Sequence, residues 1–181
     1  MKSASILKSV LALFFVATTF SAFAQQAPQE FPGIDKSPAD ILYYRTEKGA
    51  APLIKVVYGR PSKNGREVFG TLVPFGQVWR TGANEATEIT FRKDAKVAGK
   101  SIKAGTYVLH TIPNEKEWTV IFNSKLDVWG AYEYDQTKDV LRVNVPSATS
   151  DKSVDVFSMN FKGSTLVLGW DKTRVEIPIS F

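Results

Sequence analysis

Hydrophobic and polar side chains alternate along most of the chain, which is the period of a β-strand rather than that of an α-helix. Such runs recur at intervals of roughly ten residues, with turn-forming residues between them. The runs lie at 54–58, 87–91, 107–112, 118–122, 141–145, 157–161, 166–170 and 175–181. Short strands at this spacing are typical of two packed antiparallel sheets. We therefore predict an all-β fold, an antiparallel and jelly-roll-like β-sandwich of about eight strands.

Several segments indicate where strands end and how deeply they are buried. Residues 107–112 and 118–122 have almost no polar face, so both strands should be buried on two sides. Residues 146–150 (PSATS) and 162–164 (KGS) are rich in turn formers, and we expect a turn at each. Pro178 lies out of phase with its apolar neighbours and cannot donate to a sheet, so we expect it at an edge or a strand end.

Helical signals are few. Residues 38–44 (PADILYY) follow Ser37, a good helix cap, so we predict at most one short N-terminal helix there and a further turn at 136–139. The inward positions of the strands should form the core. Its predicted members are Ile89, Phe91, Leu109, Val120, Phe122, Leu141, Val143, Leu168 and Trp170.

The N-terminus has the pattern of an export signal. Lys2 and Lys8 precede an apolar run at 10–20, and residues 22–24 (AFA) form an A-x-A cleavage site. We predict a signal peptide at 1–24 that is cleaved after Ala24, a flexible Gln- and Pro-rich leader at 25–36, and one β-sandwich domain at 37–181. The mature protein should be periplasmic or extracellular.

Composition excludes several classes of function. Among 181 residues there is no Cys and one His, so no disulfide, thiol nucleophile or multi-histidine metal centre can form. The formal net charge is +5, and Lys2 and Lys8 supply two of these charges, so we expect no nucleic-acid partner. Beyond the signal, no apolar run is long enough to span a membrane. The oligomeric state is left open.

Motifs for cofactors and for nucleophilic catalysis are absent from the sequence. Residues 99–101 (GKS) resemble the end of a P-loop, but Asp94 stands where that motif requires Gly. There is no G-x-G-x-x-G, EF-hand or G-x-S-x-G pattern, so we expect no cofactor and no metal. His110 lies on the opposite parity to Leu109 and Thr111, and a packed strand residue is favoured there over a catalytic base.

The stretch 58–87 combines five Gly with Arg, Trp, Asn and Glu side chains on loops, where binding sites are often built. We predict a polar pocket with one aromatic wall, lined by Arg60, Arg66, Trp79, Arg80, Asn84 and Glu85. Three guanidinium groups in one space favour an anionic ligand, such as a carboxylated sugar. The alternative is a packing motif in which Trp79 plugs one end of the sandwich, while Arg80 and Glu85 pair with each other or cap backbone carbonyls.

A second candidate is the aromatic stretch at 129–135 (WGAYEYD). If it is extended, Tyr132 and Tyr134 share a face, and together with Trp129 they would provide a platform on which a sugar ring can stack. Aromatic side chains in sandwich proteins also serve as core, and this alternative stays open.

Several sequence blocks together carry a family resemblance. The blocks are YGRP at 58–61, the stretch at 69–87 that contains VWRTGANEAT, and the segments at 104–109, 118–123, 129–134 and 139–145. In these blocks the chain resembles the bacterial family known as domain of unknown function 2911, over residues 37–181. The resemblance implies an exported envelope protein with an all-β domain, and it implies no mechanism. His110 departs from the family, in which an aromatic such as Phe is common there.

Three functions remain after this reading. The first is a binding module for a carbohydrate or a small anionic ligand. The second is a structural or partner-binding envelope protein without a small-molecule site. The third is a hydrolase with a carboxylate pair, either Glu85 with Glu88 or Asp127 with Glu133. Two acids three residues apart in a strand face opposite ways, so Glu85 and Glu88 could act together only if a turn intervenes.

Overall fold

Ten β-strands and one turn of 3₁₀ helix form the secondary structure of the computed structural model, which describes residues 31–181. The strands are β1 (Ala39–Tyr44), β2 (Ile54–Gly59), β3 (Glu88–Phe91), β4 (Ala95–Val97), β5 (Lys100–Ile102), β6 (Gly105–Ile112), β7 (Glu117–Asn123), β8 (Asp139–Lys162), β9 (Thr165–Ile177) and β10 (Ile179–Ser180). The 3₁₀ turn is η1 (Gln136–Lys138), as expected for 136–139. The predicted signal peptide, and the leader before residue 31, lie outside the described residues.

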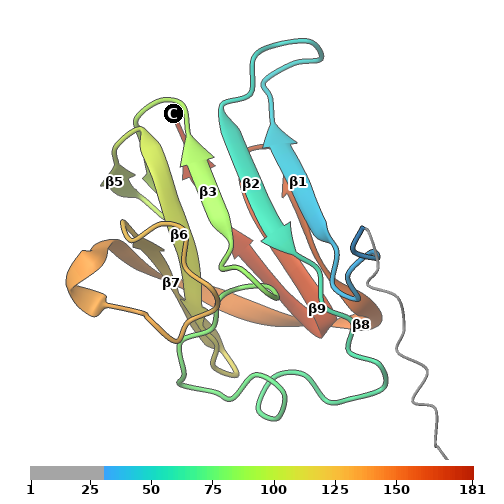
Figure 1. Cartoon of the computed structure of the whole chain (residues 1–181). Coiled ribbons are helices and arrows are strands. Elements are labelled where there is room, and N and C mark those ends of the chain that lie inside the picture. Colours follow the sequence, from blue (N-terminus) through green and yellow to red (C-terminus); the bar gives the residue numbers. More distant parts are fainter. Residues whose placement is uncertain (1–30) are drawn as a thin grey trace, which may run out of the picture. The chain divides into compact units, whose positions relative to one another are not determined.

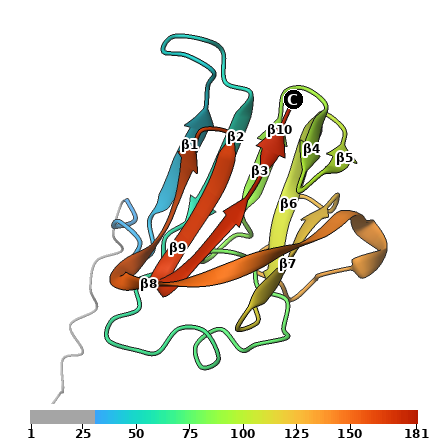
Figure 2. The ribbon, with the colours of Figure 1, turned by 180° about the vertical axis from the view of Figure 1, so that it is seen from behind.

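The strands form two antiparallel sheets in a β-sandwich-like arrangement, which confirms the predicted fold class (Figure 1). The larger sheet has the order β1-β2-β3-β6-β7-β8-β9, and the smaller one the order β10-β4-β5. Figures 1 and 2 show that β8 and β9 lie behind the layer formed by β1, β2, β3 and β6. The larger sheet thus folds over on itself to enclose the core.

The fold-over is made by β8, which pairs with two strands in succession. Its first part, from Asp139 to Pro146, pairs with β7, and its second part, from Ser147 onward, pairs with β9. The turn predicted at 146–150 is therefore wrong, because the chain bends there without leaving the sheet. Pro146 lies where β8 changes partner, a position at which a missing N–H is tolerated. The hairpin at 162–164 is confirmed as the link between β8 and β9.

The helix predicted at 38–44 is wrong, because residues 39–44 form strand β1. Its side chains are alternately exposed and half-buried, and every residue of β1 faces a partner in β2. Within β1, Asp40 accepts hydrogen bonds from Tyr58 and Arg60. Pairing with β2 therefore outweighs the local capping signal. The expectation for Pro178 is confirmed, since β9 ends at Ile177 and β10 begins at Ile179.

The core contains every predicted member. Eight of the nine are buried, and Leu141 is partly buried and packs against the others. A second, small cluster of Ala86, Val108 and Val128 lies on the opposite face of β6. Val128 belongs to the segment between β7 and η1, so this segment covers the outer face of β6. That cover explains why β6 is buried on both faces, as the sequence predicted.

Candidate functional site

Residues 60–87 form a long loop between β2 and β3 at one end of the sandwich (Figure 1). Trp79 points from this loop into the core and is 8% exposed. Its ring lies 5.1 Å from that of Phe157, 5.8 Å from that of Trp170 and 6.1 Å from that of Trp118. Backbone hydrogen bonds between Trp79 and Thr111 attach the loop to β6. Trp79 therefore closes this end of the sandwich.

The loop returns to β2 through a close backbone contact. A Cβ placed on Gly59 would lie 2.2 Å from the carbonyl oxygen of Ala83, and one on Gly82 would lie 3.0 Å from that of Gly59. Beside this contact, the buried hydroxyl of Thr87 donates to the Thr81 carbonyl at 2.7 Å. Thr81 is fully buried at a φ of 56°, an unusual backbone conformation for a β-branched residue. The glycines of the YGRP and TGAN blocks thus let the two segments touch.

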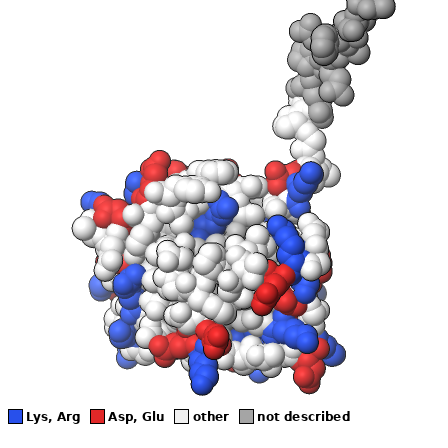
Figure 3. Space-filling model, turned by 90° about the horizontal axis from the view of Figure 1, so that it is seen from below, with Lys and Arg blue, Asp and Glu red and all other residues white. Residues whose placement is uncertain are grey.

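Two of the arginines predicted for the pocket hold the chain in place. Arg60 pairs with Asp40 at 3.1 Å and donates to the Phe157 carbonyl and the Ser158 hydroxyl, which ties β1 and β8 together. Arg66 donates to the carbonyl oxygens of Ser62 and Lys63 in its own loop. Figure 3 views this end of the molecule, where charged side chains lie mainly around the rim. The three guanidinium groups do not gather in one space.

Arg80 has a different environment. Its Nη1 donates to the carbonyl oxygen of Asn84 at 3.2 Å, and its guanidinium lies 5.5 Å from the centre of the Trp129 ring. Within residues 31–181, no carboxylate lies at ion-pair distance from Arg80, so the pair with Glu85 does not form. Arg80 instead caps a backbone carbonyl, which is the other arrangement expected for a packing motif. The Arg80 side chain therefore links the backbone at Asn84 to the Trp129 ring.

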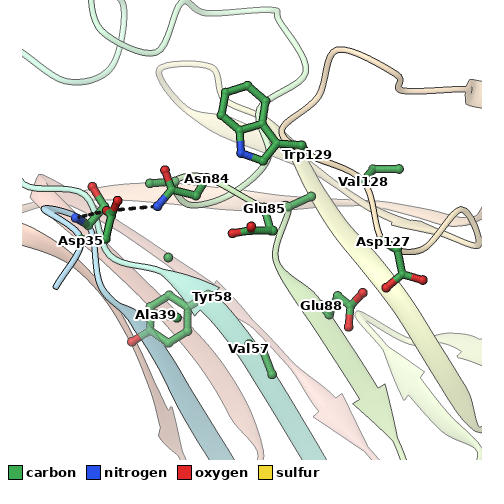
Figure 4. A pocket seen from close by; sticks show the side chains of 14 residues that line it. Asp35, Ala39, Val57, Tyr58, Asn84, Glu85, Glu88, Asp127, Val128 and Trp129 are labelled. Atoms are coloured by element: carbon green, nitrogen blue, oxygen red, sulfur yellow. Dashed lines mark hydrogen bonds between the residues drawn. The ribbon is translucent and has the colours of Figure 1, made fainter. Parts of the chain in front are cut away.

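A cavity of about 710 Å³ lies on the outer face of β2 and β3, beside these loops (Figure 4). Three parts of the chain build it: the segment before β1, the end of the long loop, and the segment after β7. Four carboxylates, one amide and one indole line it together with small and apolar residues. The lining residues are Asp35, Ser37, Ala39, Val57, Tyr58, Gly59, Ala83, Asn84, Glu85, Ala86, Glu88, Asp127, Val128 and Trp129. Among the residues that the structure describes, no Lys or Arg lines it.

Local backbone geometry aims the polar side chains at the cavity. Asn84 and Asp127 both have positive φ, 60° and 57°, as Asn and Asp tolerate in turns. Asn84 donates to Asp35 at 3.1 Å across the cavity mouth (Figure 4). The amide of Ser37 also donates to Asp35, and these two hydrogen bonds hold the pKa of the Asp35 carboxyl below its usual range. Asp35 is therefore ionised at neutral pH.

The segment 129–134 is a turn, so Tyr132 and Tyr134 do not share a face as an extended strand would place them. Trp129 and Tyr132 are 58% and 78% exposed, and their rings stack at 5.6 Å with an angle of 12°. Tyr134 turns inward and donates to Asp139 at 2.6 Å. Two of the three predicted platform aromatics thus form a pair at the rim of the cavity.

The six predicted pocket residues are distributed over three places. Asn84 and Glu85 line the large cavity, and Arg66, Trp79 and Arg80 line a separate cavity of about 250 Å³. Arg60 lines neither of these cavities. Sequence reasoning missed Asp35, which lies in the segment before β1 and is marked by no motif, and it did not assign Tyr58 of the YGRP block to the site.

The carboxylates of the first proposed hydrolase pair, Glu85 and Glu88, line the same cavity, since Glu85 still belongs to the loop and β3 begins at Glu88. In the second pair, Asp127 lines the cavity, whereas Glu133 forms an ion pair with Lys125. Figure 4 shows the carboxylates of Glu88 and Asp127 facing the same space. Residues 31–181 hold no group of three or more His or acidic side chains arranged to bind a metal ion.

A buried polar cluster lies beneath the segment that follows β7. His110 is 1% exposed and its ring contacts that of Tyr134 at 5.2 Å. Asp139 accepts from Tyr134 and Asn123 and lies 3.1 Å from the Nε of Arg142. Burial, together with the hydrogen bond to Asp139, raises the pKa of Tyr134 to about 12. Burial lowers the pKa of His110 to about 4, although the Asp139 carboxylate opposes this change. His110 is therefore a neutral, packed side chain at pH 7.

The lowered pKa of His110 predicts a loss of stability in acid. Its value in the folded state lies below 6.5, so protons bind the unfolded chain more strongly. The stabilisation present above pH 6.5 is lost as the pH falls towards 4, by about 3 kcal/mol in total. We expect His110→Phe to gain this amount relative to the parent protein between pH 7 and pH 4, measured by urea denaturation. Carboxylates titrate in both proteins and cancel in the difference. Parallel stability curves would contradict the prediction.

The fold and the cavity define a class of protein: an antiparallel β-sandwich with an acidic, aromatic-rimmed cavity on the outside of one sheet. The family model described as "Protein of unknown function (DUF2911)" matches residues 37–179, and the chain belongs to this family. No curated protein and no solved structure matches the chain. Residues 31–181 include no helix that is long and apolar enough to cross a membrane.

Proposed function

We propose that this protein binds a neutral carbohydrate in the 710 Å³ cavity. The observation that carries the proposal is the combination of lining groups: carboxylates and an amide beside a half-exposed indole. Carboxylates accept hydrogen bonds from sugar hydroxyls, Asn84 offers a donor as well as an acceptor, and the Trp129 ring offers an apolar surface for a sugar face. A cavity of this size accommodates a small-molecule ligand.

Charge supports a neutral ligand over an anionic one. Asp35, Glu85, Glu88 and Asp127 line the cavity without any basic side chain among the described residues, so an anion would be repelled. A cationic ligand is also disfavoured on the Trp129 ring, because the Arg80 guanidinium already lies 5.5 Å from its centre. A polyhydroxylated, uncharged molecule avoids both conflicts.

The proposal is tested with an array of immobilised neutral and uronic-acid glycans, followed by calorimetric titration of the glycans that bind. We expect neutral glycans to bind, with an affinity that changes little with salt, because no net charge is neutralised. Trp129→Ala and Glu88→Gln should each weaken binding about tenfold or more and change the stability by at most about 1 kcal/mol, since Trp129 is exposed and Glu88 is only partly buried.

The matched control for Glu88→Gln is Glu47→Gln, which changes an exposed carboxylate outside the cavity lining. It should leave glycan binding unchanged. Binding of uronic-acid glycans alone, lost in Arg80→Ala, would instead favour the anion site first expected around Arg66 and Arg80. Failure of every glycan to bind would contradict the proposal and leave the structural or partner-binding role.

Hydrolysis of the bound saccharide is a second candidate function. It is favoured by the positions of the Glu88 and Asp127 carboxylates. Their carboxylates face one space in the cavity, as the acid and the second carboxylate of a glycosidase do (Figure 4). Release of reducing ends from a bound glycan, abolished by Glu88→Gln and by Asp127→Asn, would support this activity. Binding without any product would exclude it for that glycan.

Export is part of the same proposal. The signal pattern at 1–24 supports it, and the mature chain would begin at Gln25 in the periplasm or outside the cell. The mass of the protein recovered from the periplasm or medium tests this, since an intact Met1 would contradict it.

A further inference from the structure

The exposed aromatic pair reaches beyond the cavity. Trp129 lines the 710 Å³ cavity. Tyr132 lines a third cavity, also of about 250 Å³, together with Val78, Trp79, Arg80 and Ala131. The two stacked rings therefore stand between two hollows of the surface, and a ligand that leaves the first hollow past Trp129 meets Tyr132 next.

The position of this pair is fixed by the chain around it. Gly130 has a φ of 74°, and a Cβ there would lie 2.8 Å from Nη1 of Arg80 and 3.0 Å from the Tyr132 ring. Arg80 is held in turn by the Asn84 carbonyl oxygen, and Trp129 pairs with Glu85 through a β-bridge. A glycine at 130 thus allows the arginine and both aromatic rings to pack closely, and the rings are oriented before any ligand arrives.

Within residues 31–181, Trp129 and Tyr132 are not part of the hydrophobic core, so core packing does not explain why these two rings lie together. Trp129 and Tyr132 are the most exposed Trp and Tyr of residues 31–181, although the other three tryptophans, at 79, 118 and 170, are at most 8% exposed. Adjacent exposed aromatic rings mark interaction sites more often than inert surface. The two rings stack on one another, with centres 5.6 Å apart and planes at 12°, so the outward face of the pair is the surface left to a ligand.

We propose that the ligand is an oligosaccharide, with one sugar unit in the large cavity and the next units crossing Trp129 and Tyr132. This inference rests on the proposed carbohydrate binding and adds to it the length of the ligand and a second subsite. An outer sugar unit stacks on the outward face of this aromatic pair, and the phenol hydroxyl of Tyr132 and the guanidinium of Arg80 are the polar groups available to it.

The experiment uses a length series of the glycan that the array identifies, from the monosaccharide to the tetrasaccharide, titrated by calorimetry into the purified protein. Tyr132→Ala is compared with Tyr43→Ala. Tyr43 is the control because it is also an exposed tyrosine, and the guanidinium of Arg45 lies 5.3 Å from its ring centre. It lies on edge strand β1 and not beside Trp129. We expect affinity to rise at least about tenfold from one unit to four, and Tyr132→Ala to remove that rise while leaving monosaccharide affinity and melting temperature unchanged.

The outcomes separate the two proposals. A monosaccharide that binds as tightly as the tetrasaccharide, with Tyr132→Ala no different from Tyr43→Ala, would overturn the second subsite and leave carbohydrate binding in place. Absence of binding by the whole length series and by the array would overturn both. Loss of monosaccharide binding in Tyr132→Ala would also contradict the inference, because Tyr132 would then act within the first subsite.

Discussion

Replacing Gly59 with Ala should destabilise the protein by about 3 kcal/mol or more, one of the largest effects of any single methyl group in this chain. The added Cβ would lie 2.2 Å from the carbonyl oxygen of Ala83 and 2.9 Å from its carbonyl carbon. Both contacts are with backbone, so no side-chain rotation relieves them. The long loop would have to move away from β2, and since Gly59 and Ala83 line the cavity, glycan binding should fail with it.

Gly65→Ala is the control that separates this contact from the general cost of losing a glycine. Gly65 has a φ of 74° with nothing within 4 Å of the added Cβ, so only backbone conformation opposes the change. It should cost about 1–2 kcal/mol. Urea denaturation of the two variants measures the difference. If Gly59→Ala were no more destabilising than Gly65→Ala, the close backbone contact would not exist in solution.

The fold could be predicted because its signal is local. Alternation with period two reports which side chains of a strand face the core, and the nine predicted core positions follow from it. The errors arose where tertiary pairing decided. Residues 38–44 carry a good cap at Ser37 yet pair with β2, and residues 146–150 read as a turn yet continue β8 from one partner strand to the next. Neither partner is visible from the local sequence.

The candidate site was less predictable, for a related reason. Gly, Arg, Trp and Asn concentrated in 58–87 did mark the loops that border the cavity, but the pattern does not say where each side chain points. Arg60 pairs with Asp40, and Trp79 enters the core, while Glu88 and Asp127 enter the cavity from segments far apart in sequence. The anionic ligand was predicted from the number of arginines in the stretch, but Arg60 lies apart from the cavity that Arg66 and Arg80 line, and none of the three lines the 710 Å³ cavity.

Trp79→Ala should cost about 3–5 kcal/mol, because it removes the aromatic side chain that closes one end of the core. Trp79 contacts Phe69, Trp118, Phe157 and Trp170 through ring distances of 5.1 to 6.1 Å, and the cavity left by truncation would be lined by these large rings, which cannot collapse into it. Trp79→Phe keeps most of the packing and should cost clearly less than Trp79→Ala. Both are measured by urea denaturation.

Trp129→Ala is the matched comparison, since it removes the same side chain from a position that is 58% exposed. Trp129→Ala should lower the stability by at most about 1 kcal/mol and weaken glycan binding. Trp79→Ala should retain glycan binding at temperatures where the variant is still folded, because Trp79 does not line the 710 Å³ cavity. The opposite result would be that Trp79→Ala stays stable and loses binding. Trp79 would then be the aromatic wall of the pocket predicted from the sequence, and the binding site would be the cavity that Arg66 and Arg80 line.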